Sequence, residues 1–414
     1  MGRAMGFRDR FTAWLTGLGA ETDSLPLLLN GLCTFLNAED YAIHRCSLAT
    51  ETVHPQMTGM RHVWYREAVE IAPVNPAVLV ERRQYRLGDA LIDEIFFNSE
   101  SQQSPQYKAS PFYQIELHGE LYETIAPPGS PQPFPLFDDL AHEGCTAYYG
   151  VTLKSFAGML QKISLATSRG GGLSPRQVDD LRWALSLLTL HINTLIEFNI
   201  KTTLARVYLG RDPGERVSKG MIAAGNVISL GGAIWFSDLR GFTETSGRLS
   251  PEALIALLNE YFGTVVGPIY AAGGEVLKYI GDAVLAVFPE ANFADGAAAC
   301  HAALEAVAET ERQLAALNAR RGPDAGPPVA HGIGLHYGDT LYGNIGVIER
   351  LDFTVIGREV NVASRIEGMI KQLGHSPICS AAFVERAGVP AESLGSFALR
   401  GVAEPVELFR LASG

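Results

Sequence analysis

Hydrophobic and polar positions alternate most regularly in the last part of the chain. Residues 250–274 carry apolar side chains at spacings of three and four, which predicts an amphipathic helix. Strands are predicted at "GAIWF" (232–236) and "VAHGIGLHYG" (329–338), with a hairpin at "GEVLKYIGDAVLAVF" (274–288) and an Ala-rich helix between the hairpin and the later strand. The order βαββαβ predicts an α+β, ferredoxin-like sandwich with its helices on one face of an antiparallel sheet. The other face would be free to meet a partner.

A long helix is predicted to precede this region. Ser174 is suited to the N-cap, Pro175 to the first helical position, and Gln177 to the third position of a capping box. Apolar residues then recur at spacings of three and four: Val178, Leu181, Leu185, Leu188, Ile192 and Leu195. The seam fits two structures equally, a helix packed on its own domain and a connector that forms a dimer and transmits a twist.

The first part of the chain has a different texture. Residues 22–168 mix short apolar runs with Pro-rich breaks such as "APPGSPQPFP", which favours an α+β domain with long loops. We therefore expect an N-terminal domain over 1–173, a helical connector over 174–227 and a C-terminal domain over 228–414. The opening "MGRAMGFRDRFTAWLTGLGAE" is predicted to be an amphipathic helix and lacks the features of a signal peptide. Because charged and polar residues interrupt "LRWALSLLTLHINTLIEF", no transmembrane segment is expected.

Composition narrows the classes of partner. The chain has 414 residues, of which 47% are hydrophobic, which is enough for two or three domains with their own cores. Its net charge of −12 argues against nucleic-acid binding, because the average surface would repel phosphates. The five cysteines are scattered without CxxC spacing, which favours a reducing, cytoplasmic location without disulfides or a zinc site.

Two aspartates are the first candidates for chemistry. Asp238 follows the predicted strand "GAIWF", and Asp282 lies at the tip of the predicted hairpin. If the two strands are neighbours, the carboxylates converge beside a loop in which Gly241 lets backbone amides turn toward a ligand. Hard oxygen ligands beside amide donors suit Mg²⁺ bound to a polyphosphate. Taken singly, Asp238 is more typical of a helix cap and Asp282 of an ordinary turn than of a metal site.

Four motifs follow one another within about 170 residues, a length typical of a single domain. They are "FSDLRGFT", "GEVLKYIGDAVLAVF", "GNIGVIERLDFTVIGREVNVASRIE" and "FALRGVAEPVELFRL". With them the region after about Ile228 resembles the catalytic domain of class III nucleotidyl cyclases. The resemblance implies a homodimer with two catalytic centres at its interface. It also implies that a nucleoside triphosphate is converted to the 3′,5′-cyclic monophosphate and pyrophosphate with the help of two Mg²⁺ or Mn²⁺ ions.

The resemblance assigns roles residue by residue. Asp238, Asp282 and the carbonyl of Leu239 match the metal ligands, and the backbone amides of Leu239, Arg240, Gly241, Phe242 and Thr243 match the phosphate-binding loop. Lys278 and Thr354 match the pair that reads the purine and favour ATP. Asn361 matches the residue that orients the ribose, Arg365 the residue that stabilises the transition state, and Arg400 a basic residue that meets the terminal phosphates. The family places these last five residues opposite the two aspartates of the partner subunit.

The resemblance therefore predicts an adenylate cyclase regulated by its N-terminal domain. The alternatives are a guanylate cyclase, disfavoured by Lys278 and Thr354, and a cyclase-like sensor module without activity. The N-terminal domain is similar in the order of its elements to a GAF-type sensor for an unidentified small molecule or signal. Its "RRQYR" segment, from Arg82, fits an anion contact and a solvated surface alike. His118, His142 and Cys145 are more typical of hydrogen-bonded or core residues than of a metal site.

Overall fold

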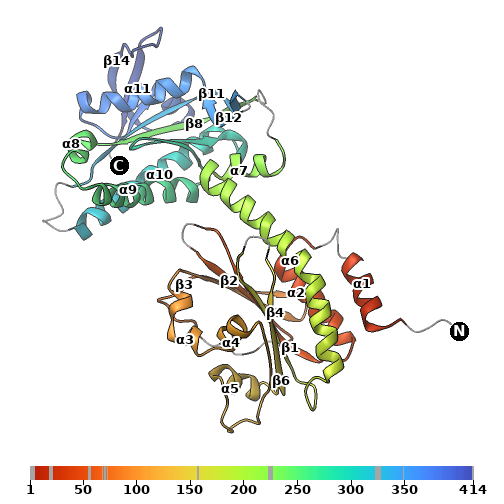
Figure 1. Ribbon diagram of the computed structural model, residues 1–414. Coiled ribbons are helices and arrows are strands. Elements are labelled where there is room, and N and C mark those ends of the chain that lie inside the picture. Colours follow the sequence, from red (N-terminus) through yellow and green to blue (C-terminus); the bar gives the residue numbers. More distant parts are fainter. Residues whose placement is uncertain are drawn as a thin grey trace. The chain divides into compact units, whose positions relative to one another are not determined.

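The structure is a computed structural model that describes residues 5–17, 22–54, 57–67, 69, 71, 73–155, 158–221, 227–321, 328–347 and 349–412. The chain divides into two compact units, Met1–Leu204 and Ala205–Gly414 (Figure 1). The division falls within the segment predicted as a connector, 174–227. Residues 222–226 of that segment lie outside the described residues.

The first unit is built on a seven-stranded antiparallel sheet in the order β3-β4-β2-β1-β7-β6-β5. Its strands are β1 (Ile43–Glu51), β2 (Gly59–Tyr65), β3 (Leu79–Leu87), β4 (Ala90–Phe97), β5 (Glu120–Thr124), β6 (Ala147–Leu153) and β7 (Gln161–Thr167). The α+β class predicted for this part of the chain is confirmed.

Helices cover both faces of this sheet. The main core lies on the face of Cys46 and Leu48, under α1 (Phe7–Gly17), α2 (Leu25–Ala38) and α6 (Pro175–Leu209). A smaller core lies on the opposite face, under α4 (Pro111–His118) and α5 (Pro135–His142), which follow η2 (Ser101–Gln103) and α3 (Pro105–Lys108). Successive residues of a strand point to opposite faces. Arg45 and Ser47 on β1 therefore face the side of the sheet that carries the smaller core.

The long helix α6 begins at Pro175, as predicted from its capping residues. The amide of Ser174 donates to Oε1 of Gln177 at 3.1 Å, and the amide of Gln177 donates to Oγ of Ser174 at 3.3 Å. The seam residues Leu181, Leu185, Leu188, Ile192 and Leu195 are buried in the main core of the first unit. The sequence left two interpretations open, and the structure agrees with the first, in which the helix packs on its own unit. These residues are not available for a dimer seam.

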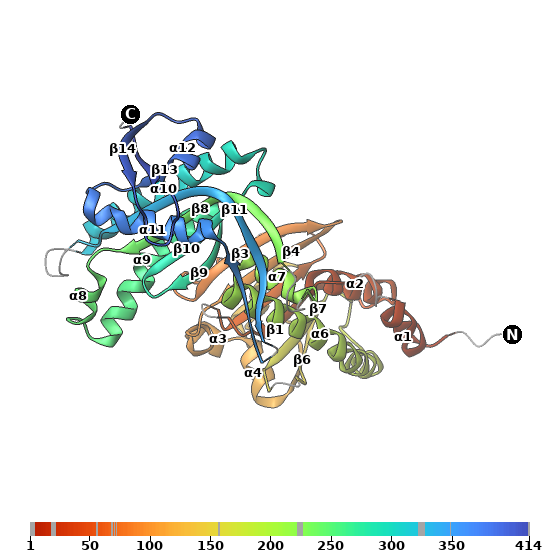
Figure 2. The ribbon, with the colours of Figure 1, turned by 90° about the horizontal axis from the view of Figure 1, so that it is seen from above.

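The second unit contains an eight-stranded sheet in the order β14-β15-β13-β11-β8-β10-β9, with β12 paired to β11. Its strands are β8 (Val227–Leu239), β9 (Glu275–Ile280), β10 (Ala283–Pro289), β11 (His331–Val347), β12 (Arg350–Ile356), β13 (Ile378–Ser380), β14 (Ala391–Phe397) and β15 (Val406–Leu411). Its helices are α7 (Arg211–Ser218), α8 (Phe242–Ser246), α9 (Pro251–Ala271), α10 (Gly296–Arg321), α11 (Arg358–Leu373) and α12 (Ala381–Ala387), with η3 (Glu290–Asn292). The predicted order is confirmed as β8-α9-β9-β10-α10-β11, and the long strands β8 and β11 run side by side (Figure 2).

The prediction that helices cover only one face of this sheet is wrong. Helices α9 and α10 pack on the face of Trp235, while α11 and the β11–β12 hairpin cover the face of Ile234 and Phe236. The reason lies in β11, where a side-chain carbon added at Gly334 would come within 2.6 Å of the backbone nitrogen of Glu367 on α11. Because glycine leaves this face of the strand bare, α11 can approach it closely.

One described helix, α9, has the length and mean hydropathy that could also suit a membrane span. Its residues Leu257, Tyr261, Val265 and Ile269 are buried in the core of the second unit. Packing on the sheet thus accounts for the apolar character of this side of the helix.

Candidate active site

Asp238 and Asp282 lie together at one end of the second sheet. Asp238 is the penultimate residue of β8, and Asp282 follows Gly281 in the turn between β9 and β10. Gly281 has φ +67°, which a residue with a side chain would adopt only at a cost. Strands β8 and β10 are antiparallel neighbours, with Ser237 opposite Val284. The convergence predicted for the two carboxylates is therefore present.

The two carboxylates crowd each other. Burial, then a hydrogen bond with Asp238 and the charge of Asp238, raises the pKa of Asp282 to about 7. The backbone amides of Asp282 and Leu239 act in the opposite direction, because they donate to the ionised form. Oδ1 of Asp238 is buried and has no hydrogen-bond partner among the described residues. Like-charged carboxylates with an unsatisfied oxygen form a donor set that fits a divalent cation.

In the loop after Asp238, some of the amides predicted to bind phosphate are free among the described residues and others are not; that of Leu239 donates to Asp282. Gly241 has φ +72° and turns the chain into α8, at whose start the amides of Phe242 and Thr243 have no helical partner. Arg240 departs from the prediction, because its amide donates to the carbonyl of Ala330 at 2.8 Å. That amide continues the pairing of β8 with the segment before β11 and is not available to a phosphate.

The side chain of Arg240 connects the loop after Asp238 to α11. Its guanidinium forms an ion pair with Oε1 of Glu367 on α11 at 2.6 Å. Glu367 is buried, and its pKa is raised first by burial and also by the charge of Asp238, while Arg240 lowers it. No motif in the sequence signals this contact, since the two residues are separated by 127 positions and only the fold brings them together.

Lys278 and Thr354 come from two strands that the β11–β12 hairpin brings into contact. Lys278 on β9 is exposed and forms an ion pair with Asp352 on β12. Asp352 and Thr354 are two positions apart on this strand, so their side chains leave the same face. Asp352 was not among the predicted site residues. Its signal in the sequence is its place two residues before Thr354 in "LDFTVIG".

Asn361 and Arg365 lie one helical turn apart on α11, and both are exposed. The other side of α11 is buried through Val362, Ala363, Ile366, Glu367 and Ile370. Arg400 is exposed in the loop between β14 and β15. Within the described parts of the chain, no hydrogen bond or ion pair links these three residues to Asp238 or Asp282. A single chain thus holds the predicted site residues in separate sets.

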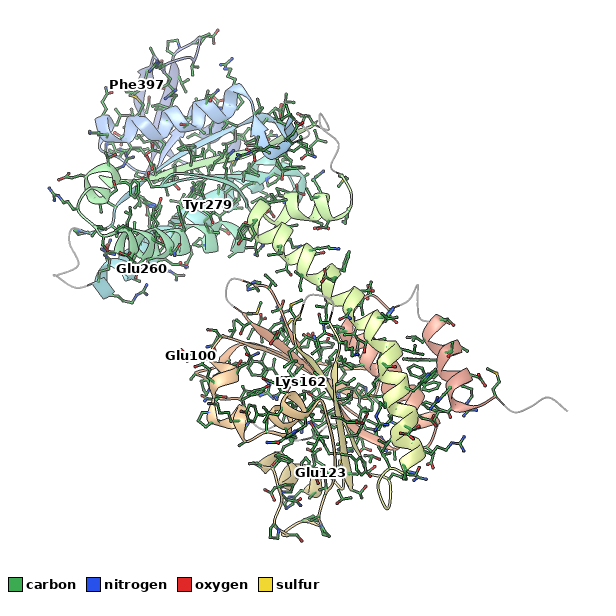
Figure 3. The ribbon with its side chains drawn as sticks, in the orientation of Figure 1. Glu100, Glu123, Lys162, Glu260, Tyr279 and Phe397 are labelled. Atoms are coloured by element: carbon green, nitrogen blue, oxygen red, sulfur yellow. The ribbon has the colours of Figure 1, made fainter. Side chains whose placement is uncertain are left out.

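The stick view of the two units shows Tyr279 on the second, next to Lys278 in the sequence (Figure 3). Tyr279 is 51% exposed, and its ring lies 4.6 Å from that of Phe262 on α9. Because successive residues of a strand point to opposite faces, this ring lies toward α9, on the other face of the sheet from Lys278 and Asp352.

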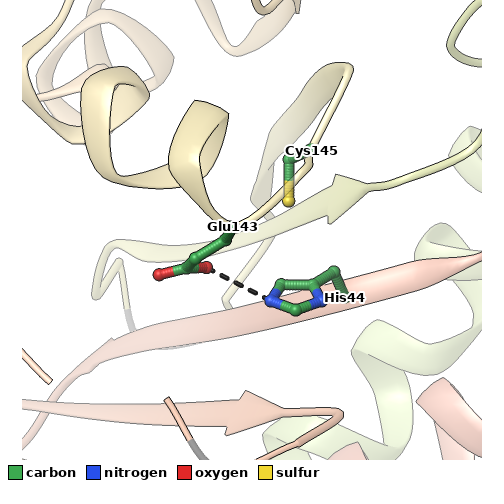
Figure 4. A group of neighbouring side chains, drawn as sticks. All are labelled: His44, Glu143 and Cys145. Atoms are coloured by element: carbon green, nitrogen blue, oxygen red, sulfur yellow. Dashed lines mark ion pairs between the residues drawn. The ribbon is translucent and has the colours of Figure 1, made fainter. Parts of the chain in front are cut away.

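A group of potential metal ligands occurs in the first unit. His44, Glu143 and Cys145 bring ligand atoms within 4.8 Å of one another, and Nε2 of His44 lies 3.3 Å from Oε2 of Glu143 (Figure 4). Burial, followed by the charge of Glu143, raises the pKa of Cys145 to about 12, so its thiol is protonated at neutral pH. His118 and His142 are exposed and do not belong to this group. The group is therefore a His–Glu pair next to a neutral thiol.

The part of the chain that matches a known protein family lies in the second unit. The family described as "Adenylate and Guanylate cyclase catalytic domain" matches residues 232–375. An adenylate cyclase of Anabaena cylindrica is 37% identical over 179 residues, which are 42% of this chain and 34% of that protein. Adenylate cyclase 1 of Rhizobium meliloti (strain 1021) is 35% identical over 209 residues, which are 48% of this chain and 30% of that protein.

Among solved structures, the adenylyl cyclase CyaB from P. aeruginosa is similar with a TM-score of 0.41 and 28% identity. The match covers 46% of this chain and 97% of that chain. The chain spans about a third of the length of each of these two curated relatives.

Proposed function

We propose that residues 232–375, which match the model of the adenylate and guanylate cyclase catalytic domain, are the catalytic domain of a class III nucleotidyl cyclase, and that the chain is an adenylate cyclase. It would convert ATP to 3′,5′-cyclic AMP and pyrophosphate. The observation that carries this proposal is the meeting of Asp238 and Asp282 at the end of β8, where one carboxylate oxygen is buried without a partner. A divalent cation bound to a polyphosphate would satisfy both carboxylates.

Asp238 and Asp282, with the carbonyl of Leu239, would hold two Mg²⁺ or Mn²⁺ ions. When bound, these ions would lower the pKa of the ribose 3′-hydroxyl and neutralise the triphosphate. The amides of Gly241, Phe242 and Thr243 would bind phosphate oxygens at the start of α8. The Arg240 amide is excluded from this set by its bond to Ala330. Its side chain would instead fix the loop through Glu367.

The chemical step would be an intramolecular displacement. The ribose 3′-oxygen would form a bond to the α-phosphorus and lose its proton to water, while the bond between the α-phosphorus and the bridging oxygen would break to release pyrophosphate. Asn361 would orient the ribose, and Arg365 would stabilise charge that develops at the α-phosphate. Loss of such a donor typically costs about 3 kcal/mol, or roughly a hundredfold in kcat. Arg400 would meet the terminal phosphates.

Base recognition would depend on Lys278 and Thr354. A lysine can donate to N1 of adenine, and a threonine hydroxyl can accept from the N6 amine, whereas guanine has the opposite pattern at both positions. The alternative is a guanylate cyclase. Replacing Lys278 by Glu together with Thr354 by Cys should shift preference toward GTP. An unchanged preference would contradict the assignment of this pair.

A homodimer would complete the site. Asn361, Arg365 and Arg400 are exposed and form no hydrogen bond or ion pair with Asp238 or Asp282 in the described parts of one chain. The β11–β12 hairpin also exposes apolar residues that a second copy would cover. Leu341 and Ile356 are opposite each other in its register and are 51% and 47% exposed. Val347 and Leu351, at the other end of the same hairpin, are also exposed.

The first test is to incubate the purified chain with ATP or GTP and with Mg²⁺ or Mn²⁺, and to identify the product by mass spectrometry. We expect cyclic AMP from ATP. Cyclic GMP as the main product would favour the alternative. Absence of any cyclic nucleotide under all four conditions would favour a cyclase-like module without activity and contradict the proposal.

A second test addresses the shared site. Asp238→Ala and Arg365→Ala chains, each inactive alone, should regain activity when mixed, because their heterodimer has one intact centre. Mixtures of two batches of the same variant are the matched control. If heterodimers form and activity does not return, the proposed division of the site between subunits is wrong.

We also propose that the first unit regulates the activity, as a sensor preceding the catalytic domain. Because α6 runs from the core of the first unit to Leu209, a change in that core would be passed into the residues that precede α7. Activity of the full chain should then change when a ligand occupies the first unit. Equal activity with that unit empty and occupied would contradict its role as a regulator.

A further inference from the structure

The first unit contains a cavity of about 790 Å³. It lies on the face of the sheet opposite the main core and is lined by strands β1, β2 and β4 and by residues of α3 and α5. A cavity of this size accommodates a small organic molecule. The lining includes the apolar or aromatic side chains of Met60, Tyr65, Ile71, Phe97 and Phe112.

Four basic side chains line this cavity, and two of them already have carboxylate partners. Arg82 binds both oxygens of Asp93, at 2.8 and 2.9 Å. Lys162, labelled in Figure 3, is buried and forms an ion pair with Glu116 at 2.6 Å. The "RRQYR" segment thus supplies one paired arginine, whereas its next residue, Arg83, is exposed and pairs with Glu81.

The other two, Arg45 and Arg61, have no hydrogen bond or ion pair with any described residue. Each lies over an aromatic ring, Arg45 at 5.0 Å from the centre of Tyr65 and Arg61 at 5.4 Å from that of Phe97. Nε of Arg61 is buried and has no hydrogen-bond partner. Both residues also line an adjoining cavity of about 120 Å³, in which Oγ of Ser47 is likewise buried and unpartnered.

Of the carboxylates that line the cavity, Asp93 pairs with Arg82, and none forms an ion pair with Arg45 or Arg61 among the described residues; the others are Glu51, Asp139 and Glu143. Glu143 lies against His44, and Glu51 accepts hydrogen bonds from the side chain of Gln102 and the amide of Leu160. Burial lowers the pKa of Arg61, and the charge of Arg45 lowers it further, while Tyr65 and Asp93 act in the opposite direction. A buried cation near other cations is costly unless an anion compensates it.

We propose that this cavity binds a small organic anion, a carboxylate or a phosphate ester on an apolar body, whose oxyanion is held by Arg45 and Arg61. Arginine presents several donors in a plane and suits both kinds of oxyanion. Ser47 can donate a further hydrogen bond, and the aromatic and aliphatic lining would cover the apolar body. The site is independent of the proposed cyclase chemistry, since its residues all belong to the first unit.

The test uses the full chain and three probes that share an aromatic ring: benzoate, phenyl phosphate and the neutral benzamide. Calorimetric titration should detect benzoate or phenyl phosphate, and benzamide should bind more weakly than either. Replacing Arg61 by Met should lower the affinity for the anion by about tenfold or more, because a charge-assisted hydrogen bond is lost. Binding of phenyl phosphate to the second unit would persist in this variant and is thereby distinguished.

A second measurement separates a ligand-binding role from a structural one. Without ligand, the Arg61→Met chain should have a higher Tm than the unchanged chain, because a buried cation without a partner is removed. Arg83→Met, on the same sheet but exposed and paired with Glu81, is the matched control and should leave binding unchanged. Arg45→Met is a second variant at the same site, and it should also weaken binding of the anion.

Three results would overturn the proposal. They are benzamide binding as tightly as the anions or no binding of either anion, undiminished binding in the folded arginine variants, and a lower Tm of the unliganded Arg61→Met chain. The relative affinities of benzoate and phenyl phosphate decide between a carboxylate and a phosphate as the group recognised.

Discussion

Lys278 on β9 is ion-paired with Asp352 on β12, and Asp352 lies two residues before Thr354 on the same strand face. The pair joins the edge of the sheet to the β11–β12 hairpin. Lysine has a long, flexible stem with many rotamers, and its ammonium can be fixed only by a partner. Asp352 therefore positions the lysine beside Thr354, in the place where the base is proposed to bind.

Replacing Asp352 by Ala should lower kcat/KM for ATP by a few-fold, mainly through KM. The pair is exposed, and exposed ion pairs are worth at most about 1 kcal/mol. Steady-state kinetics with ATP and GTP would measure the effect, and Asp352→Glu, which keeps the charge, should restore most of it. An unchanged KM for ATP in Asp352→Ala would show that Lys278 does not depend on this partner.

Replacing Asp282 by Asn should abolish cyclase activity and stabilise the metal-free protein. The crowding that raises the pKa of Asp282 to about 7 disappears when one of the two carboxylates becomes neutral. After allowance for its partial exposure to solvent, the gain at pH 8 should be about 1 kcal/mol.

Denaturation in EDTA at pH 8 measures this gain, and addition of Mg²⁺ provides the control. Mg²⁺ should raise the stability of the unchanged chain more than that of Asp282→Asn, since only the former keeps both carboxylates. A variant that is less stable in EDTA, or equally stabilised by Mg²⁺, would contradict the metal-site interpretation.

The sequence predicted those features that depend on local pattern. The helix predicted from the periodicity of 250–274 is α9, and Ser174 and Gln177 cap α6 as expected. The pairing of β8 with β10 that brings Asp238 to Asp282 followed from the order of elements. Each of these depends on residues close in the chain or on the connectivity of neighbouring strands, and both can be read from the sequence.

Other features depend on contacts between distant residues. The seam of α6 has the same spacing whether it packs on its own unit or on a second helix, so periodicity alone could not decide between them. Asp352 and Glu367 carry no distinctive motif, and they acquire partners only when the hairpin and α11 fold onto the sheet. Arg45 and Arg61 likewise become neighbours only through the adjacent strands β1 and β2.

Gly334→Ala should destabilise the second unit, because it tests how α11 comes to cover the sheet. A methyl group there would approach the backbone nitrogen of Glu367 to 2.6 Å and the carbonyl of Ala363 to 2.8 Å. Backbone atoms cannot rotate away, so the helix must shift. Overpacking of this kind typically costs about 1–3 kcal/mol.

Gly263→Ala in α9 is the matched control for this prediction. That glycine is exposed within the helix and has no atom within 4 Å of an added methyl group. Its replacement should stabilise the protein by about 0.5–1 kcal/mol, because alanine has the higher helix propensity. Chemical denaturation should therefore give changes of opposite sign, and a neutral Gly334→Ala would mean that α11 does not need the bare strand.

His331, at the start of β11, should make the second unit sensitive to acid. Burial, and then the charge of Arg240, lowers its pKa to about 4, and neither ring nitrogen has a hydrogen-bond partner among the described residues. The unfolded chain takes up a proton near pH 6.5, whereas the folded chain does so only near pH 4. Folding thus excludes a proton in this window, and stability falls as the pH decreases from about 6.5 to about 4.

The loss due to this one residue should be about 3 kcal/mol over the window. Denaturation curves between pH 4 and 7, in roughly half-unit steps, would measure it as the difference in slope between the unchanged chain and His331→Gln, which cannot gain a proton. Other acidic groups titrate in both proteins and cancel in the comparison. His118→Gln, at an exposed histidine of the first unit, should leave the slope unchanged. Equal slopes for His331→Gln and the unchanged chain would mean that the buried ring accepts its proton without a free-energy cost to the fold.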